Sequence, residues 1–533
     1  MKIKSKRTDK LYIFIFAIVL LCVFLIMMYI QRYTGFWGDD FFFSRYSHNS
    51  ELFESLNFEK GGHGGGYIGL FLCKFFSYCL PLLLNIHPAD FVGTWHSAIK
   101  AVFFILILLL MSKFSTFFNK SKWLYISTVL FLAFYVFYLT TFSNITWISY
   151  NFYRYLCSLI PLSFLLYYIY KNSLVNFKKV KLQELIVACV CAYIVGSSLE
   201  LIFYGILLFA CLLVSYNVVV KLLSKIKNLN IDFERLKLNL NYKFYLPVCV
   251  MCTAILLFTQ SSGYKTVASS RGMENINISS DLFYEFTHLY IIKCFQDIWF
   301  YWIAFLISLI VSAIFMCKRN EIKKIVFPVL LLTSVLVVVY SLILCGKTFT
   351  DCGFPQYYLN HGNIIAVYKL LILYPFFILL GYVYKLAKRK NFIKILIVSI
   401  LLIFPFYFFC ISDEQIKYKL EFFYSIKKEQ YVIEKIMRFY YLNNETPIIE
   451  PKEFLAIIKQ CMEIWEEYPS SNKLLSHMDL IYKNNDATRL GVIIGTDSIE
   501  KYYKKGGVFT EEELKELKFE NLKDNNFVLN KKE

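Results

Sequence analysis

Residues 11–30 have the sequence LYIFIFAIVLLCVFLIMMYI, an apolar run of 20 residues without a charge. A helix of this length is about 30 Å long, which matches the hydrocarbon core of a bilayer. Five basic residues precede the run: Lys2, Lys4, Lys6, Arg7 and Lys10. The run is longer than the apolar part of a typical signal peptide and no small-residue cleavage site follows it. We therefore expect a retained transmembrane helix with a cytoplasmic N-terminus.

Comparable apolar runs recur as far as residue 410. Hydrophobic residues make up 57% of the chain and its mean hydropathy is +0.50, which excludes a soluble globular protein. The further predicted spans are Trp95–Met111, Trp123–Thr140, Tyr155–Tyr170, Leu185–Leu199, Leu201–Val219, Phe244–Phe258, Ile298–Met316, Ile325–Leu344, Ile364–Tyr384 and Ile395–Cys410. We therefore predict an all-α polytopic membrane protein with about eleven transmembrane helices.

The distribution of charge supports this topology. Predicted cytoplasmic segments hold 27 Lys and Arg residues, whereas predicted external segments before residue 412 hold nine. Residues 412–533 hold 19 of the 57 basic and 22 of the 39 acidic residues, so the net charge of +18 arises in the membrane part. A basic excess in alternate loops is a topology signal, and we therefore expect a lipid bilayer and no nucleic acid as partner.

The alternation of charge holds only if Gly66–Leu84 does not cross the membrane. This stretch carries Lys74 in its middle and Pro81 near its end, which fits an interfacial or re-entrant helix. We therefore predict a transmembrane domain at residues 1–411, in which residues 31–94 form one long external loop with interfacial helices. Residues 412–533 are predicted to form a small extracytoplasmic C-terminal domain.

The apolar stretch between Lys181 and Lys221 is too long for a single span. Its roughly 35 residues should fold as a hairpin of two short helices, with the turn at Gly196–Glu200. This turn places Glu200 at or just below the outer surface. A carboxylate at that depth costs free energy unless it is paired with another group or has a function.

The first external loop begins with Gly35–Arg45, GFWGDDFFFSR, in which Asp39 and Asp40 stand among aromatic residues. Repulsion between adjacent carboxylates should raise the pKa of one of them, and such a group can act as a general base. The alternative is a helix cap at the point where the chain leaves the membrane. Arg45 could neutralise one carboxylate in either case.

Other external segments carry candidate ligands for a phosphate. His63 lies in Gly61–Gly66, whose backbone N–H groups could face a phosphate or whose glycines could form a flexible link. Trp147 and Arg154 lie at the mouth of a span, where aromatic residues usually anchor the interface and an Arg could contact a phosphate. Six of the seven histidines map to external segments: His48, His63, His87, His96, His288 and His361. Their spacing supports no specific metal site.

Three elements together resemble the GT-C class of polytopic glycosyltransferases, and within it bacterial glucosyl- and mannosyltransferase-like proteins. They are Trp37-Gly38-Asp39-Asp40 after the first span, Trp147–Pro161 at a span entrance and Gly196–Glu200 at a hairpin tip. The resemblance covers the architecture of the transmembrane domain. After the seventh span this class often has Pro-Gly-Asn followed by Arg, whereas this chain has Ser262-Gly263-Tyr264 with Arg271 further on.

The resemblance implies transfer of a sugar from a polyprenyl-phosphate-linked donor to a cell-surface glycan or lipid acceptor on the extracytoplasmic face, with inversion at the anomeric carbon. Asp39 or Asp40 would be the base, and Glu200 would orient the acceptor or serve as a second carboxylate. The implied contacts to substrate or lipid phosphate are Arg45, His63, Trp147, Arg154, Arg271 and His361. Some members of the class use Mg²⁺ or Mn²⁺ and others need no metal, and the sequence does not choose between them.

Two other functions stay open at the level of sequence. A lipid-linked glycan flippase or transporter should have charges along the middle of several spans and inverted repeats. Lys369 is the main basic residue near a span interior, and no repeat is visible. The other alternative is a non-catalytic membrane scaffold that displays the C-terminal domain.

Overall fold

The computed structural model describes residues 2–32, 67–84, 95–138, 152–174, 180–198, 200–225, 233–261, 322–344, 363–387 and 391–411, with isolated positions at 86, 265 and between 303 and 314. Within these residues every regular element is a helix, in agreement with the predicted all-α class. The loop that carries Asp39 and Asp40, most of the predicted span Ile298–Met316 and the predicted C-terminal domain lie outside the described residues.

The longer helices coincide with predicted apolar spans to within a few residues, except that α1 begins at Lys2, well before its apolar run. In chain order they are α1 (Lys2–Arg32), α3 (Tyr67–Lys74), η3 (Phe75–Cys79), α4 (Leu80–Leu83), α6 (Ser97–Ser112), η5 (Lys113–Thr116), α7 (Lys122–Tyr138), η6 (Phe152–Leu156), α10 (Leu159–Leu174), α11 (Leu182–Gly196), α12 (Glu200–Leu223), α13 (Phe233–Leu236), α14 (Tyr242–Gln260), α19 (Lys323–Leu344), α22 (Asn363–Leu386) and α23 (Asn391–Ile411). Of the short elements, η3 and η6 are π-helical turns and η5 is a 3-10 turn.

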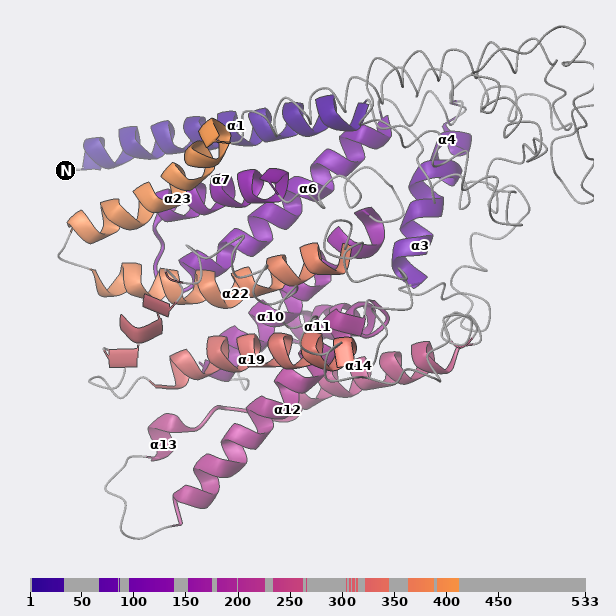
Figure 1. Ribbon diagram of the computed structural model, residues 1–533, viewed down its shortest axis with the longest axis vertical. Coiled ribbons are helices and arrows are strands. Elements are labelled where there is room, and N and C mark those ends of the chain that lie inside the picture. The colour runs from indigo at the N-terminus through magenta and orange to yellow at the C-terminus, as the bar shows by residue number, and fades with distance from the viewer. Residues whose placement is uncertain are drawn as a thin grey trace, which may run out of the picture.

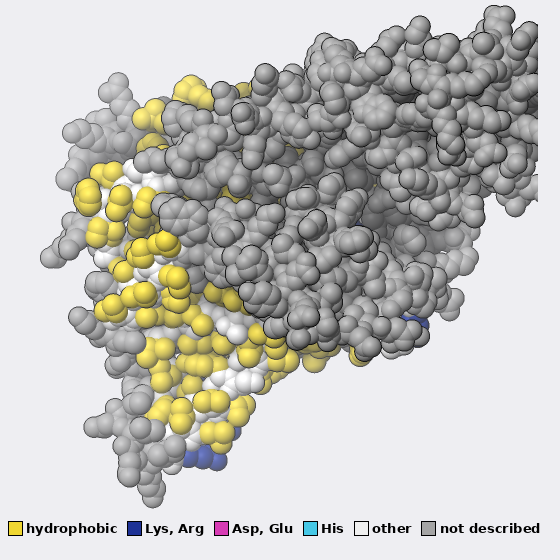
Figure 2. Space-filling view, viewed as in Figure 1, with side chains coloured by type: hydrophobic (Ala, Val, Ile, Leu, Met, Phe, Trp, Pro, Cys, Tyr) yellow, Lys and Arg dark blue, Asp and Glu magenta, His cyan; other side chains and the backbone are white. Residues whose placement is uncertain are grey.

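Six segments of the described chain are long and apolar enough to cross a membrane. They are Leu11–Met28, Ser97–Thr116, Phe152–Leu174, Leu201–Leu223, Tyr242–Gln260 and Lys369–Leu386. Shorter apolar helices lie at Lys122–Val136, Leu182–Gly196, Lys324–Val338 and Phe392–Leu402. Figure 2 shows hydrophobic side chains over most of the described surface on the visible face. This is the character of an α-helical membrane protein, because the large exposed apolar area would be costly in water.

Neighbouring helices pack lengthwise in a bundle. α1 lies along α6, α7 along α23, α11 along α14, and α19 contacts both α12 and α22. Figure 1 shows the N-terminus, the end of α22, the start of α23 and α13 on one side of the bundle, and α3 and α4 on the opposite side, where α1 ends and α6 begins. The short helices α3 and α4 therefore lie at one end of the bundle, and α13 lies at the other.

The hairpin between α11 and α12 turns where the sequence places it. α11 ends at Gly196, and the hydroxyls of Ser197 and Ser198 donate to the carbonyls of Ile194 and Val195 at 3.1 and 2.7 Å. A Cβ on Gly196 would lie 2.6 Å from the carbonyl oxygen of Met251 on α14. Glycine is therefore required at the end of α11 because α14 passes so close to it.

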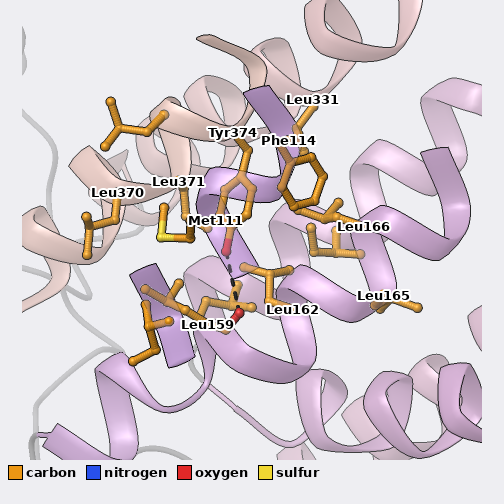
Figure 3. Close-up of a cluster of buried hydrophobic side chains, with 14 of the residues drawn as sticks. Met111, Phe114, Leu159, Leu162, Leu165, Leu166, Leu331, Leu370, Leu371 and Tyr374 are labelled. Atoms are coloured by element: carbon orange, nitrogen blue, oxygen red, sulfur yellow. Dashed lines mark hydrogen bonds between the residues drawn. The ribbon is translucent and has the colours of Figure 1, made fainter. Parts of the chain in front are cut away.

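The centre of the bundle is a cluster of aliphatic and aromatic side chains from α6, α10, α19 and α22. Figure 3 shows Tyr374 of α22 extending towards α10, with Phe114, Leu159 and Leu162 around it. The hydroxyls of Tyr374 and Ser163 are hydrogen-bonded at 2.6 Å in this buried setting. A polar contact inside an apolar core fixes how α22 lies against α10, because neither hydroxyl has water as an alternative partner.

Candidate functional site

The first turns of α6 bring two ionisable side chains into the interior. His96, which immediately precedes the apolar span Ser97–Thr116, is 1% exposed, and Lys100 is 2% exposed. Their spacing of four residues places them on one face of the helix. Figure 1 shows this end of α6 next to the end of α1, on the side of the bundle that holds α3 and α4. Charges are rare inside membrane spans and usually mark a functional position.

The π-helical turn η6 packs against this end of α6. Nε2 of His96 and the hydroxyl oxygen of Tyr153 are hydrogen-bonded at 2.9 Å, and Nζ of Lys100 lies 5.7 Å from the centroid of the Phe152 ring. The Tyr153 ring stacks on Phe76 of η3, with their centroids 5.5 Å apart. The imidazole, the ammonium group and η6 therefore form one packed unit.

Arg154 follows Tyr153 in the same turn. Its side chain is half-buried, and its guanidinium carbon lies 5.0 Å from the centroid of the Tyr155 ring. Gly69 of α3 packs directly on its backbone, since a Cβ on Gly69 would lie 2.7 Å from the Cα atom of Arg154. α3 therefore packs against the turn that contains Arg154. We call His96, Lys100, Phe152, Tyr153 and Arg154 the α6–η6 cluster.

The electrostatics of the cluster favour an anion. Burial, followed by the positive charge of Lys100, holds the pKa of His96 well below its ordinary value, so the imidazole is neutral near pH 7. Lys100 and Arg154 contribute the positive charge. α22, which contacts η6, carries a further buried lysine, Lys369, which is 9% exposed. Phosphates and carboxylates are the anions that lysine and arginine side chains bind through charge-assisted hydrogen bonds.

The structure describes two of the residues predicted for the site. Arg154 belongs to the α6–η6 cluster. Glu200 begins α12 directly after the turn of the α11–α12 hairpin, as predicted, but only its backbone is among the described atoms. The other predicted site residues lie outside the described ranges: Asp39, Asp40, Arg45, His63, Trp147, Arg271 and His361. That they belong to the same site as the cluster remains a prediction.

The sequence alone did not single out two members of the cluster for a role. His96 was counted among the histidines of the external segments, at the start of the predicted span Trp95–Met111, and the structure buries it against Tyr153. Lys100 lies inside the predicted span Trp95–Met111. The sequence could have indicated both residues. A histidine and a lysine four residues apart in an otherwise apolar run lie on one helix face, and ionisable residues in such a run are often functional.

No group of three or more His, Cys, Asp and Glu side chains in the described part of the chain is arranged to hold a metal ion. Comparisons with protein-family models, with curated protein sequences and with solved structures find no match to this chain. The case for a function therefore depends on the residues themselves.

Proposed function

We propose that the protein is a membrane glycosyltransferase that transfers a sugar from a polyprenyl-phosphate-linked donor to a glycan or lipid acceptor on the extracytoplasmic face. The observation that supports this most is the buried α6–η6 cluster, with Lys100 and Arg154 beside a neutral His96. A lipid phosphate needs a cationic site that it can enter from the bilayer. Cations held in an apolar surrounding bind it more strongly than cations in water.

The chain connection allows the proposed base to reach the end of the bundle that holds this cluster. α1 ends at Arg32 and lies along α6, whose first turns hold His96 and Lys100. Asp39 follows Arg32 by seven residues, so the chain allows a separation of at most about 25 Å between their Cα atoms. Asp39 and Asp40 are therefore tethered to the end of the bundle that holds the cluster.

In the proposed reaction an acceptor hydroxyl attacks the anomeric carbon of the donor sugar. Asp39 or Asp40 takes the hydroxyl proton as the new C–O bond forms. The bond between the anomeric carbon and the phosphate oxygen breaks, and its electron pair leaves with the lipid phosphate. Lys100 and Arg154 stabilise the negative charge on that leaving group. Attack from the face opposite the phosphate inverts the anomeric configuration.

A lipid-linked glycan flippase is a second candidate, and one observation favours it. Lys100 and Lys369 are both buried lysines on helices predicted to span the membrane. Basic side chains inside spans also line the pathways of transporters. The two functions differ in chemistry, because a flippase moves its lipid without breaking the bond between sugar and phosphate.

The test uses membrane vesicles that contain the full chain and a panel of polyprenyl-phosphate-linked hexoses with a labelled sugar. Transfer of label to an acceptor and release of polyprenyl phosphate support the glycosyltransferase. The Asp39→Asn/Asp40→Asn variant should lose transfer, and Lys100→Gln should lower it by about 10²- to 10³-fold, as for removal of one donor to a developing anion. Lys113→Gln, an exposed position at the far end of α6, is the control and should keep full transfer.

Two results contradict the proposal. Full transfer by the double Asn variant would remove the base. Movement of a labelled lipid-linked glycan across the vesicle membrane, with the sugar–phosphate bond intact and no transfer to any acceptor, would favour the flippase.

A further inference from the structure

The other end of α6 carries a second group of basic side chains, built around Phe118. Nζ of Lys324 on α19 lies 5.8 Å from the centroid of the Phe118 ring, and Nζ of Lys385 on α22 lies 5.7 Å from the same centroid. Lys324 is also 5.9 Å from the ring centroid of Tyr382. Two ammonium groups from different helices thus face one aromatic ring at distances typical of cation–π contacts.

The connection between η5 and α7 holds Phe118 in this position. The side chain of Asn119 donates to the carbonyl of Gly381 at 3.0 Å, and the hydroxyl of Ser121 donates to that of Tyr384 at 2.9 Å. Phe118 itself meets the Tyr382 ring edge to face, with their centroids 5.2 Å apart. These contacts fix the ring against α22, so the two lysines are positioned before any ligand arrives.

A third lysine, on α23, extends the group. Nζ of Lys394 lies 5.8 Å from the centroid of the ring of Tyr384, which precedes Lys385 on α22. The sequence between the two helices adds Lys388-Arg389-Lys390, and no residue from 385 to 394 is acidic. We call Phe118, Lys324, Lys385 and Lys394 the Phe118 cluster. Its positive charge is concentrated where three helices meet.

Apolar surface lies directly beside this charge. Phe392 and Ile395 of α23 are 76% and 63% exposed, and they flank Lys394 in the sequence. A free phosphate would gain nothing from these side chains, whereas a phospholipid would place its acyl chains along them. Basic side chains next to a bilayer-facing apolar helix are the arrangement that binds anionic lipid headgroups.

We propose that the Phe118 cluster binds the phosphate headgroup of an anionic phospholipid. Lys324 and Lys385 contact the phosphate oxygens, Lys394 contacts the outer part of the headgroup, and the acyl chains lie along Phe392 and Ile395. This site is at the opposite end of α6 from the α6–η6 cluster, so it does not depend on the proposed sugar transfer.

The test measures lipid binding to the purified full chain in detergent by native mass spectrometry. Phosphatidylglycerol should bind more tightly than phosphatidylcholine. Lys324→Gln/Lys385→Gln should weaken the binding of phosphatidylglycerol about thirtyfold, the effect of two lysine contacts to an anionic surface. Lys113→Gln, an exposed lysine of the same end, should leave the binding unchanged. Lys324→Arg/Lys385→Arg keeps the charge and should keep most of the affinity.

Further variants keep the test decisive if the double Gln protein does not fold. Lys394→Gln changes a side chain at the edge of the cluster and should weaken binding about fivefold. Equal binding of the two lipids, or unchanged binding of phosphatidylglycerol by Lys394→Gln and the double Gln variant, overturns the proposal. Competition by inorganic phosphate at the same concentration as the lipid also overturns it, because the site would then recognise phosphate without the acyl chains.

Discussion

Nε2 of His96 lies 2.9 Å from the hydroxyl oxygen of Tyr153, and this hydrogen bond joins the start of α6 to the π-helical turn that carries Arg154. Both side chains are buried. Because burial and the charge of Lys100 lower the pKa of His96, the folded protein keeps this imidazole neutral where an exposed histidine would already take up a proton. The stability that the folded protein gains from burying His96 therefore depends on pH.

This linkage predicts that acid weakens the fold through His96. The unfolded chain protonates its histidines below a pH of about 6.5, whereas folded His96 stays neutral until a lower pH. The unfolded state then binds the extra proton, and stability falls as pH falls, by up to about 1.4 kcal/mol per pH unit. His96→Gln should make the thermal unfolding midpoint of the purified protein less sensitive to pH between 7 and 5.

Tyr153→Phe is the companion variant for this test. It removes the hydrogen bond but keeps the imidazole buried, so it should lower stability at every pH and leave the pH dependence in place. If His96→Gln and the unchanged protein lose stability in parallel as the pH falls, the linkage to His96 is wrong.

A second prediction concerns Gly381 on α22. A Cβ at this position would overlap the backbone carbonyl of Ser115, which lies in the η5 turn. Gly381→Ala should therefore separate η5 from α22 and lower the unfolding midpoint, at a cost of about 1–3 kcal/mol for overpacking. Gly205 on α12 is the matched control, since no atom in the described part of the chain lies within 4 Å of its added Cβ. Gly205→Ala should stabilise its helix slightly, and equal destabilisation by both variants would argue against the close contact.

A third prediction connects packing to activity, and it depends on the proposed function. Gly69→Ala would push α3 away from the backbone of Arg154. Because a displacement of the phosphate contact by an ångström weakens catalysis strongly, sugar transfer should fall by about 10²-fold. Thermal stability should change far less, since α3 is a short helix at the end of the bundle. A loss of stability with unchanged transfer would instead assign Gly69 a structural role alone.

The positions of the helices followed from the sequence because apolar run length dictates them. The turn at Gly196–Glu200 was predictable for the same reason, since two short spans had to divide one long run. The α6–η6 cluster was only partly predictable. Arg154 was predicted as a site residue because it is a charged residue at the entrance of a span. The role of Tyr153 depends on its hydrogen bond to His96, 57 residues away in the sequence, and hydropathy does not predict such a pairing.

The number of spans remains a prediction from the apolar runs, and the side of each loop remains a prediction from charge. The structure gathers basic residues of several predicted cytoplasmic segments at one end of the bundle: Lys122 lies 5.0 Å from the Tyr12 ring, and Lys324 and Lys385 share Phe118. This grouping follows from the alternating helix directions, which the spacing of spans already implied. Which membrane face it represents is a matter for the proposed function.

The last prediction contrasts two buried tyrosines. The hydroxyl of Tyr374 is hydrogen-bonded to Ser163 at 2.6 Å, whereas the buried hydroxyl of Tyr170 has no hydrogen-bond partner among the described residues. Tyr374→Phe should destabilise the protein by about 0.6–1.7 kcal/mol, the range for hydrogen bonds between membrane helices. Tyr170→Phe removes a buried polar group without breaking a bond, so the unfolding midpoint should stay equal or rise. Ser163→Ala combined with Tyr374→Phe should cost less than the sum of the single changes, because both remove the same bond. Destabilisation by Tyr170→Phe as large as that by Tyr374→Phe would show that the Tyr170 hydroxyl is satisfied.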